Sequence, residues 1–118
     1  DARRTAGVSL GPLDGRLVSI KDLLDVAGET TTAGSRILAD RAPAAADAPV
    51  VARLRRAGAV ILGKTNMSEF AFSGLGLNPH FGTPGNASDR SLVPGGSSAG
   101  AGVSVGEGTS EISIGTDT

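Results

Sequence analysis

Two short apolar runs, each closed by a lysine, flank an amphipathic segment, and this order constrains the fold more than any other feature of the sequence. The first run, residues 17–20, follows an Asp-Gly turn and ends at Lys21, and the second, residues 60–62, is followed closely by Lys64. Short runs of Val, Ile and Leu bounded by turn residues are typical of buried strands. Strand, helix and strand in this order predict an α/β fold, part of a mostly parallel or mixed sheet with flanking helices.

The segment between the two runs carries the signals of a helix. Val50, Val51, Leu54 and Ala57 fall at helical spacing, and three arginines occupy the outer and C-terminal face. We expect Asp47 to cap this helix, Pro49 to lie in its first turn and Gly58 to end it.

The rest of the chain divides into loops and shorter elements. Residues 30–43 are rich in Thr, Gly, Ser and Pro, and residues 75–94 contain Asn-Pro and Pro-Gly-Asn turns, so both are expected to be loops. A loop as long as the second is often functional. The remaining elements that we expect are a helix at residues 68–72 with Ser68 or Asn66 as its cap, a helix that begins near Ser97, and a last strand at residues 111–114.

Composition limits the classes of function. The 118 residues have the size of one domain, and three phenylalanines without Trp or Tyr leave the core to Val, Leu, Ile and Ala. A net charge of -1 gives no electrostatic footprint for nucleic acid, and no basic block suggests a membrane surface. There is no cysteine, and one histidine leaves few options for zinc, so we expect neither metal nor cofactor. A cytoplasmic protein is the expectation.

Two catalytic patterns match the sequence without the context that each requires. Residues 58–65 fit the phosphate-loop pattern, but the four intervening residues are Ala-Val-Ile-Leu, which are typical of a strand rather than of a flexible loop. Residues 96–100 fit the nucleophile elbow with Ser98 as the nucleophile, but that fold places its histidine after the serine. The only histidine, His80, precedes Ser98 and is interpreted as a residue that fixes its loop.

The two lysines are candidates for acid–base chemistry. The chain has nine arginines and only Lys21 and Lys64, and each lysine lies at or near the end of an apolar strand. A lysine desolvated at such a place can lose its proton near neutral pH, which arginine cannot do, and can then act as a general base. The alternative is a lysine that only packs at the strand end and extends its amine to water.

Five motifs in unbroken order resemble the amidase signature family, from about Gly11 to Thr118. They are Gly-Pro-Leu-Asp-Gly at residues 11–15, Ser-Ile-Lys-Asp at 19–22, Thr-Thr-Ala-Gly-Ser at 31–35, the segment at 57–70 that contains Gly-Lys-Thr-Asn-Met-Ser-Glu-Phe, and Pro-Gly-Gly-Ser-Ser at 94–98 followed by Gly-Thr-Asp-Thr at 115–118. The resemblance also accounts for the apparent phosphate loop, because the same strand and lysine occur in that family without a phosphate role.

The resemblance implies a Ser-Ser-Lys triad that acts on an amide. Lys21 matches the catalytic lysine, and Ser97 matches the serine that follows a cis peptide bond and relays a proton. Ser98 is then a neighbouring structural hydroxyl. The substrate-binding positions implied by the resemblance are Phe72, Ser73, Gly95 and Gly96. Asp117 is expected to fix its local turn.

In the family the acyl-forming serine follows Gly-Thr-Asp-Thr, so the resemblance places the nucleophile and the oxyanion hole after Thr118. We therefore expect residues 1–118 to be a single partial domain, truncated at both ends and inactive alone. The expected parent is an amide hydrolase that forms an acyl-enzyme. The alternatives are the amidase-like subunit of a glutamyl-tRNA amidotransferase and a fragment with only a structural or binding role. The expected partners are a small amide substrate, the remainder of the amidase chain and a second copy of the protein, with neither nucleic acid nor membrane.

Overall fold

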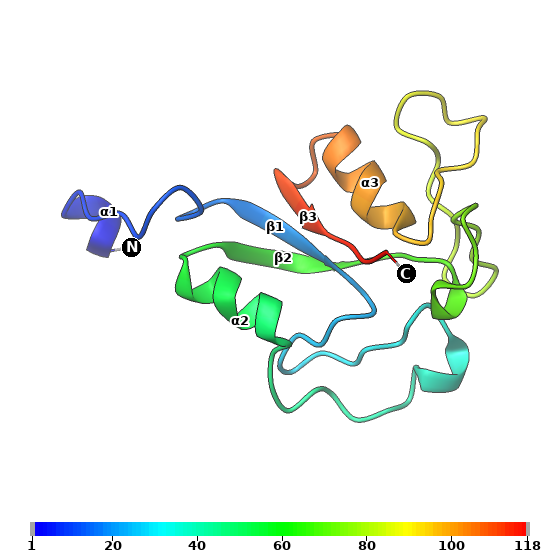
Figure 1. Cartoon of the computed structure of the whole chain (residues 1–118), viewed down its shortest axis with the longest axis horizontal. Helices are drawn as coiled ribbons and strands as arrows, with labels where there is room; N and C mark the ends of the chain where they lie inside the picture. Colours follow the sequence, from blue (N-terminus) through cyan, green and yellow to red (C-terminus); the bar gives the residue numbers. More distant parts are fainter. Residues whose placement is uncertain (1, 118) are drawn as a thin grey trace.

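The computed structural model, which describes residues 2–117, is built on a three-stranded parallel sheet (Figure 1). Strand β1 (Leu17–Lys21) lies in the centre, between β2 (Val60–Thr65) and β3 (Ile112–Ile114), and both neighbours run parallel to it. The predicted α/β class with a parallel sheet is therefore confirmed. Because β2 continues as a strand to Thr65, the segment that fits the phosphate-loop pattern forms no phosphate-binding loop.

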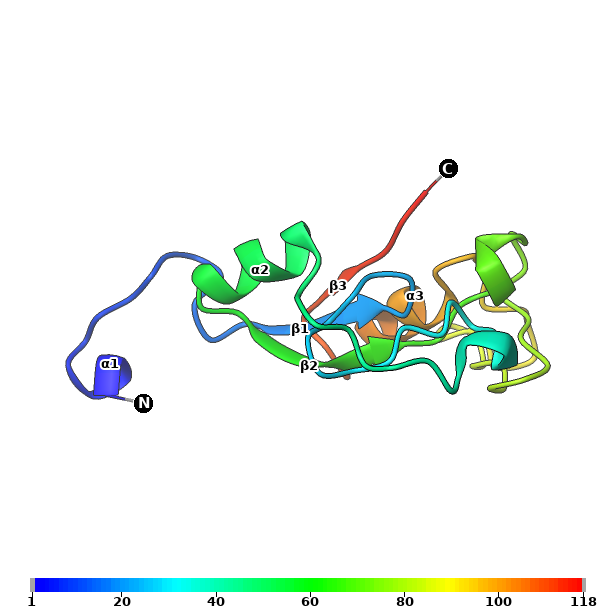
Figure 2. The same ribbon diagram turned by 90° about the horizontal axis from the view of Figure 1, so that it is seen from below.

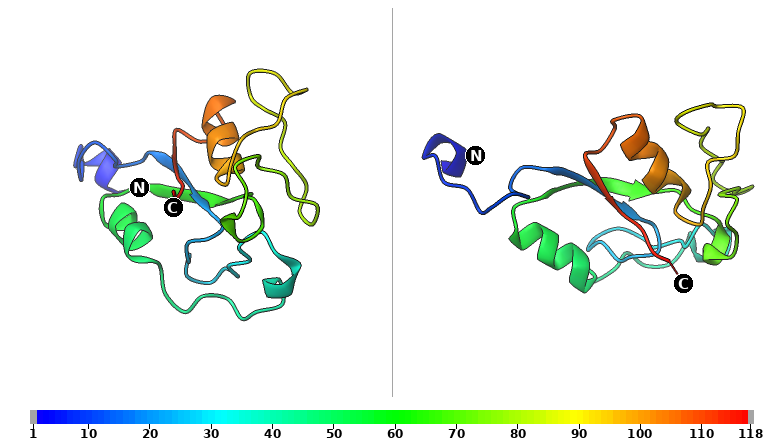
Figure 3. Two further views of the ribbon diagram at one scale, coloured as in Figure 1. Left: turned by 45° about the vertical axis from the view of Figure 1, so that its right-hand side comes forward. Right: turned by 45° about the horizontal axis from the view of Figure 1, so that its top comes forward.

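Helices cover the two faces of this sheet (Figures 1 and 3). Helix α2 (Pro49–Arg56) lies on one side and α3 (Ala99–Gly106) on the other. Side chains alternate along β1, so Val18 and Ile20 face α2 and pack with its Val51 and Leu54 in the main hydrophobic core. Partly buried isoleucines of β3 extend the same core.

The opposite face of β1 is polar. Ser19 and Lys21 alternate with the core residues and are buried on the side of the sheet that α3 covers. Helix α3 begins at Ala99, as the sequence predicted for a helix near Ser97, and its buried residues are small: Ala99, Ala101 and Val103. One face of β1 therefore contributes to the hydrophobic core, and the other face carries Lys21.

The cap of α2 differs from the prediction. The capping residue is Ala48, without a side-chain hydrogen bond, and Pro49 is the first helical residue as expected. Asp47 instead accepts a hydrogen bond from the Ala27 amide at 2.8 Å and pairs with Arg55 at 2.8 Å. Its carboxylate therefore joins the preceding loop to the helix. The local sequence pattern is the same for this role and for a helix cap, so the sequence alone could not separate them.

Other predicted elements are shorter than expected. The helix expected at residues 68–72 is one 3-10 turn, η2 (Glu69–Ala71). Ser68 is its capping residue, as expected, but its hydroxyl donates to the Ser73 carbonyl and makes no capping hydrogen bond. The last strand begins at Ile112, one residue later than expected, and the Glu111 carboxylate before it accepts the Leu17 amide hydrogen at 2.8 Å. The loop at residues 30–43 contains a second 3-10 turn, η1 (Arg36–Leu38).

Two further segments complete the chain. Helix α1 (Ala2–Thr5), which the sequence did not predict, stands apart from the sheet (Figure 2) and is tied by Arg3 to Asp14 at 3.0 Å. Residues 75–94 contain neither helix nor strand, as predicted, and lie beside α3 (Figure 1). Within residues 2–117 no helix has the length and apolar character needed to cross a membrane.

Candidate active site

Three hydroxyl and amine groups meet at the carboxyl edge of the sheet. Lys21 ends β1, Thr116 follows β3 by two residues, and Ser97 immediately precedes Ser98, the capping residue of α3. Lys21 Nζ lies 2.6 Å from Ser97 Oγ and 2.8 Å from Thr116 Oγ1. The carboxyl ends of parallel strands are where open α/β sheets place their ligands. The structure therefore brings the two predicted catalytic residues into direct contact at a typical position for an active site.

Lys21 is in an environment that favours its neutral form. Its side chain is 0% exposed, and its amine contacts hydroxyl oxygens rather than a carboxylate. Burial lowers the pKa of the Lys21 amine below the ordinary lysine value, and the negative charge of Asp117 partly offsets this effect. A neutral amine 2.6 Å from a serine hydroxyl can accept its proton.

Ser97 and Ser98 have different partners. The Gly96-Ser97 peptide bond is cis, and Ser97 contacts Lys21. Ser98 Oγ accepts the Thr116 amide hydrogen at 3.3 Å and donates to the Thr116 carbonyl at 3.2 Å. Ser98 thus holds the backbone of Thr116, while Ser97 contacts the amine directly.

Thr116 is a site residue that the sequence analysis did not single out. It was part of a matched motif, but no local pattern indicated that its hydroxyl would reach the lysine of another strand. The signal available was its position, since a residue two places beyond a strand parallel to β1 lies at the same sheet edge as Lys21.

Lys64 is held in an ion pair. Its Nζ lies 2.7 Å from Asp22 Oδ1 and donates to Thr31 Oγ1 at 2.9 Å, and its side chain is 8% exposed. The other Asp22 oxygen accepts hydrogen bonds from the backbone and the hydroxyl of Thr32. Because the Lys64 amine is engaged by a carboxylate whereas the Lys21 amine contacts hydroxyl oxygens, Lys21 is the better candidate for a base.

The Asp22–Lys64 pair is expected to contribute strongly to stability. Replacing Asp22 with Asn leaves the Lys64 ammonium buried without its counter-ion, which should lower the free energy of unfolding by about 2–4 kcal/mol. Urea unfolding of the protein measures this change. The exposed pair of Arg90 and Glu107, 3.4 Å apart, provides the control, because Glu107→Gln should change stability by less than about 0.5 kcal/mol.

An Asp22→Asn/Lys64→Met double variant tests the cause of that loss. It removes both charges, so it should recover part of the stability that the single change costs. If the single Asp22→Asn variant is as stable as the parent, the pair does not hold the loop after β1 against β2.

The predicted substrate-binding residues lie on two adjoining segments. Phe72 is 92% exposed, and Phe72 and Ser73 line a hollow of about 440 Å³ together with Ser68, Glu69, Phe70, Leu77 and Pro79. The amides of Gly95 and Gly96 donate to the carbonyls of Leu75 and Gly74 at 3.1 and 2.8 Å. Because these two N–H groups are already engaged, any contact of Gly95 or Gly96 with a substrate must come from Cα or a carbonyl.

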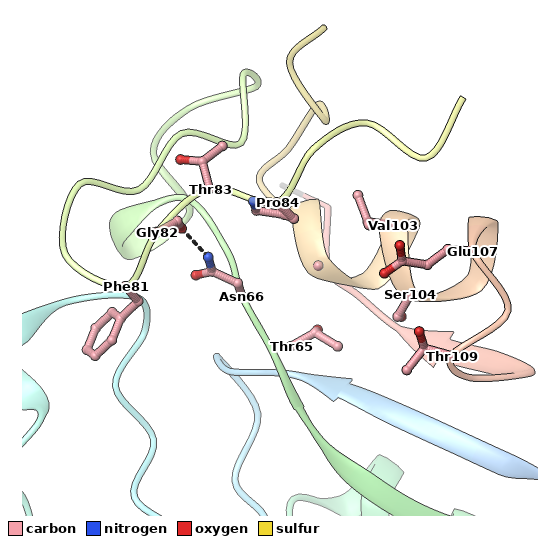
Figure 4. Close-up of a pocket in the computed structure, with 11 residues that line it drawn as sticks. Thr65, Asn66, Phe81, Gly82, Thr83, Pro84, Val103, Ser104, Glu107 and Thr109 are labelled. Carbon is pink, nitrogen blue, oxygen red and sulfur yellow. Dashed lines mark hydrogen bonds between the residues drawn. The ribbon is translucent and has the colours of Figure 1, made fainter. Parts of the chain in front are cut away.

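Another pocket lies away from the lysine. It has a volume of about 400 Å³ and is bounded by the end of β2, the loop at residues 81–84 and one side of α3 (Figure 4). Asn66 spans part of it and donates its amide hydrogen to the Gly82 carbonyl. Since neither Lys21 nor Ser97 lines this pocket, its position does not suit the chemistry of that pair.

His80 has a structural set of contacts. Its Nε2 lies 3.2 Å from Glu69 Oε1, and its amide donates to the Asn78 side chain at 2.8 Å. The Asn78 amide group in turn donates to the carbonyls of Gly34 and Met67, each at 2.8 Å. The prediction that His80 fixes its loop agrees with these contacts. Among residues 2–117 no group of three or more His, Cys, Asp or Glu side chains could hold a metal ion.

A parallel sheet that carries a buried lysine against a serine hydroxyl at its carboxyl edge is compatible with the class of amide hydrolases that the sequence resembles. The chain belongs to the amidase family, whose model, described as Amidase, matches residues 1–118. The family resemblance seen in the sequence motifs is therefore confirmed.

Several known proteins are similar over the whole of this chain. It is 45% identical to AtzE, a 1-carboxybiuret hydrolase subunit of Pseudomonas sp. (strain ADP), covering 100% of this chain and 26% of that protein. It is 48% identical to one subunit of the glutamyl-tRNA(Gln) amidotransferase of Salinispora tropica, covering 100% of this chain and 24% of that protein. The solved peptide amidase of Stenotrophomonas maltophilia superposes with a TM-score of 0.87 at 40% identity, covering 98% and 24% of the two chains. The chain spans about a quarter of the length of these relatives.

Proposed function

We propose that the whole protein hydrolyses a carboxylic amide and that Lys21 and Ser97 are its base and proton relay. The observation that carries the proposal is the 2.6 Å separation of Lys21 Nζ and Ser97 Oγ around an amine with no exposed surface. A buried amine whose pKa is lowered is more readily neutral and able to accept a proton, and a hydroxyl within hydrogen-bond distance can both donate and accept one. Family membership supports the same chemistry.

The proposed reaction moves one proton along this pair. The Ser97 hydroxyl passes its proton to the Lys21 amine and receives the proton of an acyl-forming serine, which the family resemblance places after Thr118. The serine oxygen attacks the amide carbon, and the C–N bond breaks as the proton returns through Ser97 to the leaving nitrogen. Water then attacks the acyl-enzyme ester, which releases the carboxylic acid and restores the serine hydroxyl.

We propose that the hollow beside Phe72 and Ser73 receives part of the substrate. The hollow is lined by the segment at residues 68–79, and two carbonyls of this segment accept hydrogen bonds from the amides of Gly95 and Gly96. These two glycines immediately precede Ser97, so the hollow lies near the candidate relay. The exposed Phe72 ring offers apolar area to an acyl or amine group. The names of the relatives, a carboxybiuret hydrolase, a peptide amidase and a chloromuconic acid deaminase, indicate different substrates, so they support the reaction class more than one compound.

A second candidate function is that of an amidotransferase component. The observation in its favour is 48% identity to a subunit of a glutamyl-tRNA(Gln) amidotransferase over all 118 residues. In that case ammonia released from an amide would pass to partner subunits. A companion protein that copurifies with the chain and is needed for amide turnover would favour this candidate, and turnover by a lone polypeptide would exclude it.

The test is amide turnover by the full-length protein, alone and with the subunits that copurify with it. A panel of short carboxylic amides is assayed for released ammonia, and a fluorophosphonate probe reports an activated serine as a mass increase. We expect both signals. If neither appears, with or without companion subunits, the proposed function is wrong.

The pH dependence tests the base more directly. Because the neutral form of Lys21 is the active one, kcat/KM should rise with pH through an apparent pKa below the ordinary lysine value of about 10.4. The Asp117 charge raises that pKa, so Asp117→Asn should shift the rising limb to lower pH. A shift to higher pH, or a profile without a rising limb, would contradict the assignment.

A further inference from the structure

A cluster of four serine hydroxyls lies between the sheet and α3, and we call it the serine cluster. Its members are Ser19, Ser104, Ser110 and Ser113. Ser19 Oγ lies 2.8 Å from Ser113 Oγ, 3.0 Å from Ser110 Oγ and 3.2 Å from Ser104 Oγ. Ser19 and Ser110 are buried, at 5% and 3% exposed. Ser19 is thus the centre of a hydroxyl network that is largely shielded from water.

The network has a partner for each of its protons. Ser19 donates to Ser113 Oγ, Ser113 donates to the Ser19 carbonyl, and Ser110 donates to Ser104 Oγ. Ser104 donates its single proton either to Ser19 Oγ at 3.2 Å, which joins α3 to β1, or to the Ala101 carbonyl of its own helix at 3.0 Å. Hydrogen bonds depend on direction as well as on distance, so a buried polar network of this kind restricts how the elements that it joins can be placed.

Apolar packing on this side of the sheet is weak. Helix α3 contains three glycines, and its buried side chains are two alanines and a valine, in contrast to the larger apolar side chains under α2. Small side chains bury little apolar area and so contribute little hydrophobic stabilisation. The hydrogen bonds of the serine cluster therefore join the second half of α3 to the sheet, while the Gly100 amide, which donates to the Asn66 carbonyl at 2.9 Å, holds the first turn.

The elements joined by the serine cluster are those that carry the candidate active site. Ser19 precedes Lys21 by two residues on β1, and the two side chains share a face. Ser113 lies on β3, three residues before Thr116, and Ser104 lies on α3, whose start follows Ser97. One hydroxyl, that of Ser19, links all three elements.

We propose that Ser19 is a positioning residue that sets the separation of Lys21 Nζ and Ser97 Oγ by fixing α3 and β3 against β1. This inference deepens the proposed function and rests on it only for its kinetic readout. Without the Ser19 hydroxyl, α3 keeps its own hydrogen bonds but loses the contact of Ser104 with β1. The amine and the relay hydroxyl then lose their fixed separation, and water gains access to the amine.

The test compares Ser19→Ala with Ser110→Ala in the full-length protein. Both changes remove one buried hydroxyl of the serine cluster, but Ser110 lies in the turn between α3 and β3 and not on an element of the site. Ser19→Ala should lower kcat about tenfold with KM changed less than twofold, and should move the rising limb of the pH profile to higher pH. Ser110→Ala should leave kcat and the pH profile close to those of the parent.

Ser19→Thr is the conservative rescue. It keeps the hydroxyl, and the residue paired with Ser19 on β2 is Gly63, which has no side chain to obstruct the added methyl group. It should recover most of the kcat lost in Ser19→Ala. Equal losses in Ser19→Ala and Ser110→Ala would show a general loss of packing and would overturn the proposal.

Two readouts do not depend on turnover. A crystal structure of Ser19→Ala should show the Lys21 Nζ to Ser97 Oγ distance lengthened beyond hydrogen-bond range, and NMR titration of the Lys21 side chain should show a raised pKa. If the parent has no amidase activity but these two changes occur, the positioning role stands and the proposed function fails. If both quantities match the parent, the positioning role fails. Should Ser19→Ala not fold, Ser104→Ala removes the same link from α3, and the same outcomes decide.

Discussion

Lys21→Met is expected to lower kcat for amide hydrolysis by the full-length protein by about four powers of ten or more, with the fold retained. The methionine side chain has a similar length and no proton acceptor, so the Ser97 hydroxyl keeps its place but loses its base. Removal of one member of a nucleophile–base unit typically costs this much, because the members act together. A fluorophosphonate probe should label the variant slower by a similar factor.

Stability provides the control within this experiment. The change removes a buried amine whose desolvation is costly, but it also leaves the hydroxyls of Ser97 and Thr116 without that partner. The two effects oppose each other, so the thermal midpoint should stay within about 5 °C of the parent.

Lys64→Arg, which keeps the positive charge beside Asp22, is the matched variant of the other lysine and should cost less than about tenfold in kcat. If Lys64→Arg is as harmful as Lys21→Met, the wrong lysine has been assigned.

The sequence predicted those parts of the molecule that local patterns determine. The sequence predicted a strand at residues 17–20 with Lys21 at its end, and the structure has this strand as β1. The division of its side chains between a face with Ser19 and Lys21 and a face with Val18 and Ile20 was seen only in the structure. The order of strand, helix and strand was enough for a parallel sheet, since a crossover connection that contains one helix leaves few alternatives. The family resemblance was enough to choose Lys21 over Lys64 as the candidate base. The physical difference between the two lysines, hydroxyl contacts for Lys21 and a carboxylate contact for Lys64, was seen only in the structure.

The parts that the sequence did not predict depend on contacts between distant residues. The partner of Lys64 is Asp22, which lies far from it in the sequence, and this contact exists only because β1 and β2 are neighbours. Asp47 was predicted as a helix cap, but its carboxylate binds Ala27 and Arg55 instead. The contact of Thr116 with Lys21 requires the register of β3 against β1, which no local propensity encodes. Each of these interactions needs the fold before it can be inferred.

The four serines of the serine cluster show the same limit. Each serine alone is an ordinary polar residue in a small-residue segment, and Ser104 in α3 would be expected to face solvent or its own helix. They form a network only because β1, β3 and α3 meet at one place. The sequence shows the individual serines, whereas only the fold shows which of them meet.

Ser97→Ala is the second change with a large expected effect, and it should lower kcat by about three powers of ten. The methyl group of alanine keeps the backbone of the turn but removes the oxygen 2.6 Å from Lys21 Nζ, so the proton has no direct path to the amine. Transfer through a water molecule in the vacated space would account for the residual rate. Mass spectrometry of the acyl-enzyme under single turnover measures the step directly, and acylation should slow by the same factor as kcat.

Ser98→Ala is the neighbouring variant that separates the two hydroxyls. Ser98 contacts the Thr116 backbone and not the Lys21 amine, so its loss should reduce kcat about tenfold through a less well placed Thr116. Ser91→Ala, which removes an exposed hydroxyl bonded to Asp89, should leave kcat unchanged. If Ser98→Ala proves the more harmful of the two adjacent changes, the relay is Ser98, and the contact of Ser97 with the lysine is structural. A much larger loss in Ser97→Ala than in Ser98→Ala requires that, of these two adjacent serines, Ser97 carries the proton to the buried amine.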